Sequence, residues 1–241
     1  MPRFFIDPPA PDGLVTLTGE AANHISRALR MKPGEHLTLC DGRGTDYDAA
    51  LQSAAPGCVT AQVLAARPSA GEPNVRLLLF QGLPKGDKMD WIVQKAVELG
   101  AAEIVPFAAA RSVSRPDNAA ARKKTARWQK IADEAAGQSQ RGILPPVRPL
   151  VSFGAALEQA RACDRIFFCY EGGGSALDAL LSEPFASAAI FIGPEGGFAP
   201  EEVAQAEQAG ARRITLGPRI LRTETAPLAA LSAILFATGN M

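Results

Sequence analysis

The sequence contains very little histidine. His24 and His36 are the only two, and residues 37–241 contain none. A multi-histidine metal site is therefore not expected, and most of the chain has no histidine that could act as a general base. The four cysteines include no CxxC pair, which argues against a zinc ribbon or a thioredoxin-type motif. We expect reduced thiols that pack as small apolar side chains.

The sequence also lacks long apolar runs and a secretory signal. No run reaches the ~20 apolar residues that a membrane-spanning helix needs. The most apolar stretch, Leu228–Ala237, indicates a short buried helix. Residues 1–13 carry prolines and acidic side chains where a signal peptide would have an apolar core. These features predict a cytoplasmic protein with no membrane partner.

The chain as a whole has no excess of charge of either sign. Its 241 residues carry 25 basic and 25 acidic side chains, and 47% of them are hydrophobic, as in ordinary globular proteins. A net charge of zero argues against a uniformly basic nucleic-acid binder. The charges are unevenly spread, however, because residues 73–150 carry thirteen basic and seven acidic groups. The segments before and after them are net acidic.

Residues 1–72 indicate a small β domain. Short apolar runs alternate there with clusters of turn residues, a spacing typical of a β-barrel or sandwich, and they lie at 14–18, 36–40 and 59–66. One helix is predicted around residues 21–30. The segment at 67–74, RPSAGEPN, is rich in proline, glycine and serine and predicts a domain boundary.

Residues 73–241 alternate between predicted strands and helices. The strands are short and apolar, as parallel strands covered on both faces should be, and lie at 75–81, 103–107, 165–170, 189–193 and 213–217. The helices are expected near 89–97, 118–137, 155–162, 200–210 and 227–237. Gly100 is expected to cap the first helix, and Pro227 to lie in the first turn of the last one. This order predicts an α/β fold with a mostly parallel sheet.

Three glycine-containing loops follow predicted strands in this half. The sharpest is Gly193–Gly197, where backbone amides could approach a ligand at a helix N-terminus. The loops at 217–222 and 82–88 also follow strands, so all three would open at the ligand-binding edge of a parallel sheet. None of them has the GxGxxG, P-loop or GxSxG pattern. A tight turn without a ligand fits the first loop equally well.

Together these loops and their flanking helices resemble the RsmE family, the SPOUT-class 16S ribosomal RNA uridine-N3 methyltransferases. The similar segments are KGDKMDWIVQKAVELGAAEIVPF (85–107), RWQKIADEAAGQSQR (127–141), IGPEGGF (192–198) and LGPRILRTETAPLAAL (216–231). Residues 24–44, HISRALRMKPGEHLTLCDGRG, resemble the opening domain of that family. Four motifs in the right order make the resemblance far more specific than one glycine loop.

The resemblance implies a fold, a cofactor and a partner. Residues 1–72 would form a PUA-like, RNA-binding β-barrel, and residues 73–241 a SPOUT methyltransferase domain with a parallel sheet and a C-terminal trefoil knot. The family works as a homodimer on 16S ribosomal RNA or the 30S subunit, and binds S-adenosylmethionine in the knotted loops. The matching cofactor-binding positions are Leu79, Gly82, Gly193, Pro194, Glu195, Gly196, Gly197, Leu216, Gly217, Ile220, Leu221, Arg222 and Thr223.

The implied chemistry suits these loops. The sulfonium of S-adenosylmethionine is already activated, so no metal is expected and catalysis rests on placing the uridine N3 in line with the methyl group. Arg222 is the candidate cation that stabilises the developing uracil anion. Glu195 or Glu224 is the candidate base, although Glu224 also fits a role in capping the last helix.

Positive charge marks the expected RNA surface. Basic side chains in the middle segment could bind phosphate without reading sequence, although a charge run on a helix is usually a solvated face. Trp128 shares helical spacing with Ile131 and Ala135, which indicates a core residue rather than a stacking platform. With the family resemblance, the side chains expected to face RNA are Arg3, Arg27, Arg30, Lys85, Lys88, Arg111, Arg115 and Arg141.

Two other functions fit the sequence. The same fold without catalysis would be an RNA-binding or ribosome-assembly factor, although RNA binding alone has no need of the glycine loops. A SPOUT methyltransferase with another target, such as transfer RNA or a ribose 2′-hydroxyl, is the third hypothesis, since fold alone does not fix the substrate.

Overall fold

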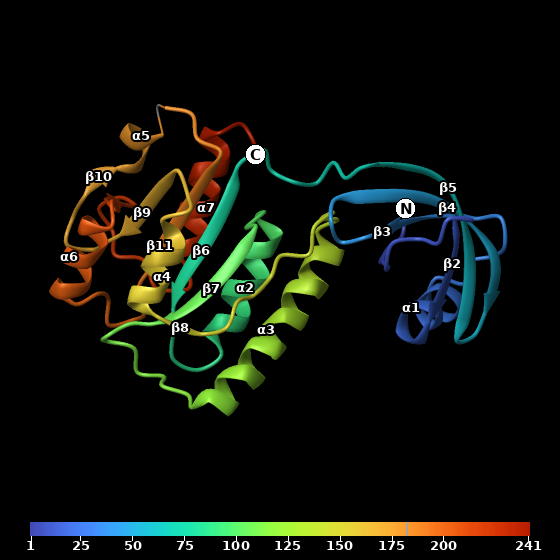
Figure 1. The fold of residues 1–241 in the computed structure, drawn as a ribbon, viewed down its shortest axis with the longest axis horizontal. Coiled ribbons are helices and arrows are strands. Elements are labelled where there is room, and N and C mark those ends of the chain that lie inside the picture. The colour runs from blue at the N-terminus through green and yellow to red at the C-terminus, as the bar shows by residue number, and fades with distance from the viewer. Residues whose placement is uncertain (182) are drawn as a thin grey trace. The chain divides into compact units, whose positions relative to one another are not determined.

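The computed structural model describes residues 1–181 and 183–241, which form two compact units (Figure 1). The first unit comprises Met1–Glu72 and Ala136–Leu144, and the second comprises Pro73–Ala135 and Pro145–Met241. Among the described residues, no helix has both the length and the apolarity that a membrane crossing requires.

The first unit is built on a five-stranded sheet in the order β1-β3-β4-β5-β2. Its strands are β1 (Arg3–Phe5), β2 (Leu14–Thr18), β3 (His36–Cys40), β4 (Thr45–Ala55) and β5 (Cys58–Pro68). β1 and β3 run parallel, and the other neighbours run antiparallel. Alternate strand residues such as Leu37 and Leu39 pack with Ile25 into a small apolar core.

The helix predicted around residues 21–30 is present in a modified form. α1 (Gly19–Asn23) runs directly into a π-helical turn, η1 (His24–Ala28), and Arg30 then takes a left-handed backbone with a φ of 54°. β4 is not predicted from its sequence, because its alanine, aspartate and glutamine residues have little strand preference. Pairing with β3 on one side and β5 on the other holds it in the sheet.

The segment Ala136–Leu144 pairs with the turn between β3 and β4. The N–H of Gly44 donates to the carbonyl of Gly142, and the N–H of Leu144 donates to the carbonyl of Gly42, both at 3.0 Å. Nothing in the local pattern predicts this pairing, because the partners lie about a hundred residues apart in the sequence.

The second unit has a seven-stranded parallel sheet in the order β10-β12-β9-β11-β6-β7-β8. Its strands are β6 (Arg76–Gly82), β7 (Glu103–Ala108), β8 (Val151–Ser152), β9 (Arg165–Cys169), β10 (Ser175–Ala176), β11 (Ser187–Ile192) and β12 (Arg212–Thr215). The helices are α2 (Lys88–Glu98), α3 (Asn118–Gln138), α4 (Phe153–Ala160), α5 (Leu177–Leu180), α6 (Pro200–Gln208) and α7 (Ala226–Ala237).

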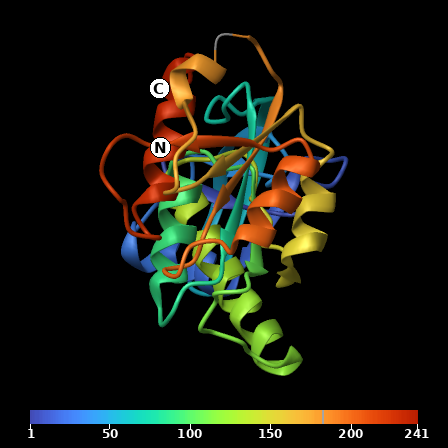
Figure 2. The same cartoon turned by 90° about the vertical axis from the view of Figure 1, so that its left-hand side faces the viewer.

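Helices cover both faces of the parallel sheet. Figure 2 shows α2 and α7 on one side of it, and α4 and α6 on the other. On the side of α4 and α6 the core is aromatic: Phe80 and Phe191 are fully buried and stack with ring centroids 4.6 Å apart. Burial on both faces explains why these strands read as continuous apolar runs in the sequence.

Strand register places the ends of several strands at one edge of the sheet. Gln81 of β6 lies opposite Ile192 of β11, and Gly82 lies opposite Phe107 of β7. β9 pairs with both β11 and β12, so their carboxyl ends lie at the same edge. The loops that follow these strands therefore meet where open α/β sheets bind ligands.

The predicted helix ends and the predicted role of Trp128 are confirmed. Gly100 has a φ of 100°, and the N–H of Ala101 donates to the carbonyl of Ala96 at 2.9 Å, which closes α2. Pro227 lies in the first turn of α7. Trp128 is 3% exposed, and its Nε1 donates to Asp90 at 3.1 Å, so it belongs to the core.

The predicted fold class is confirmed in its two main parts. A small β-sheet unit contains the N-terminal residues, and a parallel α/β unit with helices on both faces follows. The trefoil knot stays a prediction from the family resemblance.

Candidate functional site

A cavity of about 520 Å³ lies in the second unit, at the carboxyl ends of β9, β11 and β12. Lys88 and Ala226 contribute to it from the two helices α2 and α7. Its other lining residues come from three strand ends and the loops that follow them: Cys169, Tyr170 and Glu171, then Ile192, Gly193, Pro194, Glu195 and Gly197, then the run 214–223. Two of these loops are the glycine-containing segments singled out from the sequence.

The cavity brings together ten of the thirteen predicted cofactor-binding residues. The three others, Leu79, Gly82 and Gly196, do not line it. Leu79 is fully buried within β6. A Cβ on Gly82 would lie 2.6 Å from the ring of Pro194, and one on Gly196 would lie 2.9 Å from the Cβ of Arg111. Gly82 thus allows the end of β6 to pack closely against Pro194, and Gly196 allows Arg111 to approach the glycine loop.

The end of β9 is the part of the site that sequence reasoning missed. Glu171 lines the cavity, and a Cβ added at Gly197 would lie 2.3 Å from its Oε1. Gly197 also has a φ of 65°, a conformation that favours glycine. The residues 169–171 carry no motif, and they reach the site because β9 lies between β11 and β12. Burial raises the pKa of the nearby Cys169 thiol to about 12, so it stays protonated.

Lys88 joins the two carboxylates that were candidate bases. Its Nζ lies 2.7 Å from Glu195 and 3.4 Å from Glu224, and the backbone N–H of Lys85 also donates to Glu195 at 3.2 Å. Burial raises the pKa of the Glu195 carboxyl, but these hydrogen bonds outweigh it and hold the pKa below its ordinary value. Glu195 lines the cavity, whereas Glu224 is not among its lining residues. Lys88 therefore serves an ion pair here, instead of offering a free charge to a ligand.

We expect Lys88→Met to raise the pKa of the Glu195 carboxyl toward its ordinary value, because it removes both a hydrogen bond and an opposite charge. In the wild type, this depressed pKa contributes stability above the unfolded-state value of about 4.3. The contribution is lost as the pH falls through the lower folded value. Carbon-13 NMR titration of the glutamate side chains measures the shift.

Lys85→Met is the matched control for that titration. It keeps the backbone N–H that donates to Glu195, so the carboxyl should titrate as in the wild type. A Glu195 pKa that is the same in Lys88→Met and in the wild type would contradict the assigned cause.

Arg222 is another lining residue of the same cavity. The residue is exposed and lines the cavity, and no hydrogen bond or ion pair of its side chain is found within residues 1–181 and 183–241. Its backbone carbonyl accepts from the N–H groups of Thr225 and Ala226, both at 2.9 Å, at the start of α7. The backbone of Arg222 therefore supports the helix, and its guanidinium is available to a ligand.

The buried carboxylate of Glu202 holds the loop that carries Arg111 and Arg115 beside the glycine loop. Glu202 is 7% exposed and accepts from the N–H groups of Ala110 at 2.8 Å and Ala199 at 2.9 Å. Arg111 follows Ala110 and donates to the carbonyl of Gly196 at 3.2 Å. Arg115 is exposed on the same loop. Of the predicted RNA-facing residues, Arg111 thus contacts the glycine loop, and Arg115 lies on the same loop as Arg111.

Two other predicted RNA-facing arginines are structural instead, and this corrects the prediction for them. Arg141 is 2% exposed and is paired with Glu72 at 2.6 Å, so it is not a surface cation. Arg3 forms a bidentate pair with Asp46 at 2.5 and 3.0 Å, and only 11% of its side chain is exposed. Arg27 and Arg30 are exposed at the end of η1, as expected of surface cations.

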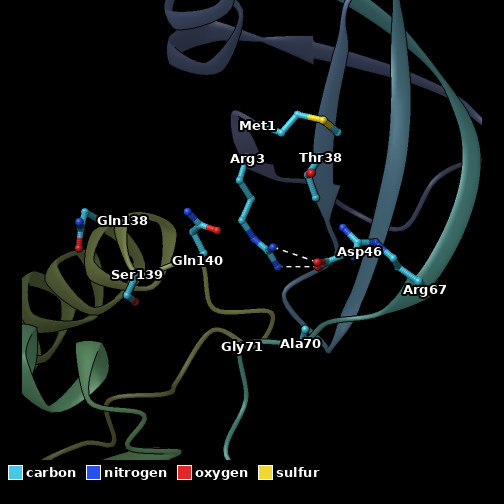
Figure 3. A pocket seen from close by; sticks show the side chains of 10 residues that line it. All are labelled: Met1, Arg3, Thr38, Asp46, Arg67, Ala70, Gly71, Gln138, Ser139 and Gln140. Carbon is cyan, nitrogen blue, oxygen red and sulfur yellow. Dashed lines mark hydrogen bonds and ion pairs between the residues drawn. The ribbon is translucent and has the colours of Figure 1, made fainter. Parts of the chain in front are cut away.

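The Arg3–Asp46 pair forms one wall of a separate cavity of about 560 Å³ in the first unit (Figure 3). The lining residues are Met1, Arg3, Thr38, Asp46, Arg67, Ala70, Gly71, Gln138, Ser139 and Gln140. In Figure 3 the guanidinium of Arg3 points at Asp46, so the two charges neutralise each other. Burial raises the pKa of the Asp46 carboxyl, but hydrogen bonds from Ser69 and Arg3 outweigh this effect and hold the pKa below its ordinary value. No residue of the glycine loops lines this cavity.

The described residues contain no group of three or more histidine, cysteine, aspartate and glutamate side chains that could hold a metal ion. The polar groups of the cavity in the second unit are instead the backbone at its glycines, the carboxylates of Glu171 and Glu195, the ammonium of Lys88, and arginines.

Comparisons with known proteins agree with this arrangement. A family model described as "RNA methyltransferase domain" matches residues 71–235, and one described as "RNA methyltransferase PUA domain" matches residues 17–64. The ribosomal RNA small subunit methyltransferase E of Bacillus subtilis is 41% identical over 230 residues, which cover 92% of this chain and 90% of the relative.

Solved structures give the same result. The ribosomal RNA small subunit methyltransferase E from Neisseria gonorrhoeae, bound to S-adenosylmethionine, superposes with a TM-score of 0.87 at 34% identity, covering 98% of this chain and 97% of that one. A Legionella pneumophila methyltransferase solved with bound cofactor SAM superposes with a TM-score of 0.85 at 30% identity and the same coverage. The resemblance seen in the sequence motifs is therefore confirmed, and the chain belongs to the ribosomal RNA small subunit methyltransferase E (RsmE) family.

Proposed function

We propose that the protein transfers the methyl group of S-adenosylmethionine to N3 of a uridine in 16S ribosomal RNA. The observation that carries this proposal is the single cavity formed by the glycine loops of the family motifs. The names of full-length relatives support ribosomal RNA of the small subunit as substrate. The choice of uridine N3 rests on the motif resemblance. We further propose that the two units act as an RNA-binding domain and a methyltransferase domain in the cytoplasm.

The cavity has the properties that this cofactor requires. Its volume of about 520 Å³ lies within the usual range for small-molecule sites. Gly193 and Gly197 line the cavity without side chains, so an adenine can approach the backbone there, and Ile220 and Leu221 offer apolar surface to its ring. When bound there, the cofactor would supply an activated methyl group.

Side chains of the protein must stabilise the developing charge and accept the N3 proton. We propose that Arg222 stabilises the negative charge that develops on the uracil oxygens, because its guanidinium is free to face a ligand. Glu195 lines the cavity, but its lowered pKa makes it a weak base near neutral pH. Glu224 lies beside Lys88 and does not line the cavity. That either Glu195 or Glu224 acts as the base stays a prediction.

We propose that Arg111 and Arg115 contact RNA phosphates beside the cavity. Changing either residue to alanine should lower the salt slope of RNA binding by up to ~1 unit, because each phosphate contact releases bound counterions. Fluorescence anisotropy at several salt concentrations measures the slope. Arg161→Ala, which removes an exposed arginine paired with Glu158, should leave the slope unchanged. An unchanged slope in both loop variants would contradict this contact.

We also propose a homodimer, in keeping with the family. Ile220 at the cavity loop is 85% exposed, and Phe236 on α7 is 75% exposed. Burying such side chains against a second copy would remove apolar surface from water. Analytical ultracentrifugation should show a dimer at micromolar concentration, and a stable monomer would refute the proposal.

The proposed substrate can be tested in the organism that encodes the chain. Deleting the gene should remove one N3-methyluridine from 16S ribosomal RNA, as mapped by ribonuclease digestion and mass spectrometry. Restoring the gene should restore the modification. If every N3-methyluridine persisted in the deletion strain, the proposed function would be wrong.

A further inference from the structure

One buried glutamine connects three segments that lie far apart in the sequence. Gln81, at the end of β6, is fully buried, and its Nε2 donates to the carbonyl of Gly82 at 3.0 Å and to Oγ1 of Thr223 at 3.1 Å. The Thr223 hydroxyl donates in turn to the carbonyl of Gly193 at 2.7 Å. An amide and a hydroxyl thus connect the end of β6, the glycine loop after β11 and the loop before α7.

The hydroxyl of Thr223 has a defined direction in this chain of bonds. It has one proton, and that proton is given to Gly193, so the oxygen must accept from its other neighbour. Gln81 provides the matching donor. Thr223 and Gly193 both line the cavity, whereas Gln81 stands behind it and contributes no lining atom.

Fold stability alone does not explain a glutamine at this position. Its Oε1 is buried and accepts no hydrogen bond within the described part of the chain. A buried, unpaired acceptor costs about 1–3 kcal/mol, and such groups are rare in native proteins. An apolar side chain of similar length would pack against the buried residues of β6 without this cost. What it could not do is donate to Thr223.

We propose that Gln81 is a positioning residue for the methyl-donor site. It orients the Thr223 hydroxyl and thereby fixes the distance between the glycine loop and the loop that carries Arg222. This inference rests on the proposed function, because it assumes that the cavity binds S-adenosylmethionine. Binding sites lose affinity when their walls are displaced by fractions of an ångström, so a residue that never touches the ligand can control its binding.

Four variants test the proposal: Gln81→Leu, Thr223→Val, the double variant, and Thr223→Ser. Each of the first two should weaken S-adenosylmethionine binding by roughly tenfold, about the worth of one buried hydrogen bond. The double variant should be no weaker than about twentyfold, because both changes break the same connection. Thr223→Ser keeps the hydroxyl and should bind within about threefold of the wild type. Isothermal titration calorimetry measures all of these without methyl transfer.

RNA affinity distinguishes a role of Gln81 in positioning the cofactor loops from general damage to the fold. If Gln81 acts only on the cofactor loops, RNA affinity measured by anisotropy should be unchanged in Gln81→Leu. If near-ultraviolet circular dichroism shows that Gln81→Leu does not fold, the comparison of Thr223→Val with Thr223→Ser decides the question.

These experiments distinguish a failure of this inference from a failure of the proposed function. A wild-type protein that does not bind S-adenosylmethionine would overturn the proposed function and this inference with it. Wild-type affinity in both Gln81→Leu and Thr223→Val, or equal losses in Thr223→Val and Thr223→Ser, would overturn this inference alone. So would fully additive losses in the double variant.

Discussion

Arg222→Ala should reduce methyl transfer to the ribosomal RNA substrate by roughly 100- to 1,000-fold. That is the usual cost of removing one group that stabilises charge in a transition state, about 2.7–4 kcal/mol. The cavity is lined by the carboxylates of Glu171 and Glu195 and by two exposed arginines, Arg219 and Arg222. Loss of the Arg222 side chain would remove one positive charge from the surroundings of the developing uracil anion.

The fold should survive this change. The hydrogen bonds between Arg222 and the start of α7 are accepted by its backbone carbonyl, which alanine retains. Cofactor affinity should therefore change by no more than a few-fold, so the loss appears in kcat. Arg222→Lys should recover only part of the rate, because an ammonium cannot donate along two parallel directions as a guanidinium does.

Arg213→Ala is the matched control for charge. Arg213 is a surface residue of β12 paired with Glu207 at 2.7 Å, outside the cavity lining. Its removal should leave turnover unchanged. Single-turnover methyl transfer with labelled cofactor measures each variant. Full turnover in Arg222→Ala with unchanged cofactor affinity would show that the assigned role is wrong.

Gly82→Ala should weaken S-adenosylmethionine binding by on the order of 100-fold. The new Cβ would lie 2.6 Å from Cδ and 2.7 Å from the backbone nitrogen of Pro194, and 3.1 Å from the carbonyl carbon of Gly193. None of these atoms belongs to a flexible side chain, so the glycine loop itself must move toward the cavity. Forced repacking of this kind costs typically ~1–3 kcal/mol, and a 100-fold loss of affinity corresponds to about 2.7 kcal/mol.

Gly154→Ala is the control for adding a methyl group. Gly154 lies in α4, where a Cβ would meet no atom within 4 Å, so alanine should be neutral or slightly stabilising. Calorimetry of both variants gives the cofactor affinity, and thermal unfolding reports the fold. Wild-type affinity in Gly82→Ala would mean that the contact between Gly82 and Pro194 does not shape the site.

The strands and loops of the second unit were predictable because their signals are local. β6, β7, β9 and β11 are short, mostly apolar runs bounded by turn residues, and the glycine loop after β11 is visible as a cluster. β8 and β10 have two residues each and carry no pattern of their own. β4 is held by its neighbours on both sides, which no window of sequence can reveal.

Long-range pairing explains what could not be predicted at the site. Glu171 reaches the cavity only because β9 lies between β11 and β12. Arg141 reads as a surface cation, but its partner Glu72 stands 69 residues earlier in the chain. Gln81 did leave a signal, as a polar residue inside an otherwise apolar strand, although its role needs the position of Thr223 to be understood.

The most direct test of the central claim is methyl transfer by the purified protein. 30S subunits or 16S ribosomal RNA from the deletion strain would be incubated with methyl-labelled S-adenosylmethionine, digested to nucleosides and analysed by mass spectrometry. The proposed function predicts one labelled methyl group per RNA, found as N3-methyluridine. Label on a ribose or another base would contradict the choice of N3, and no transfer to either substrate would contradict the enzymatic function.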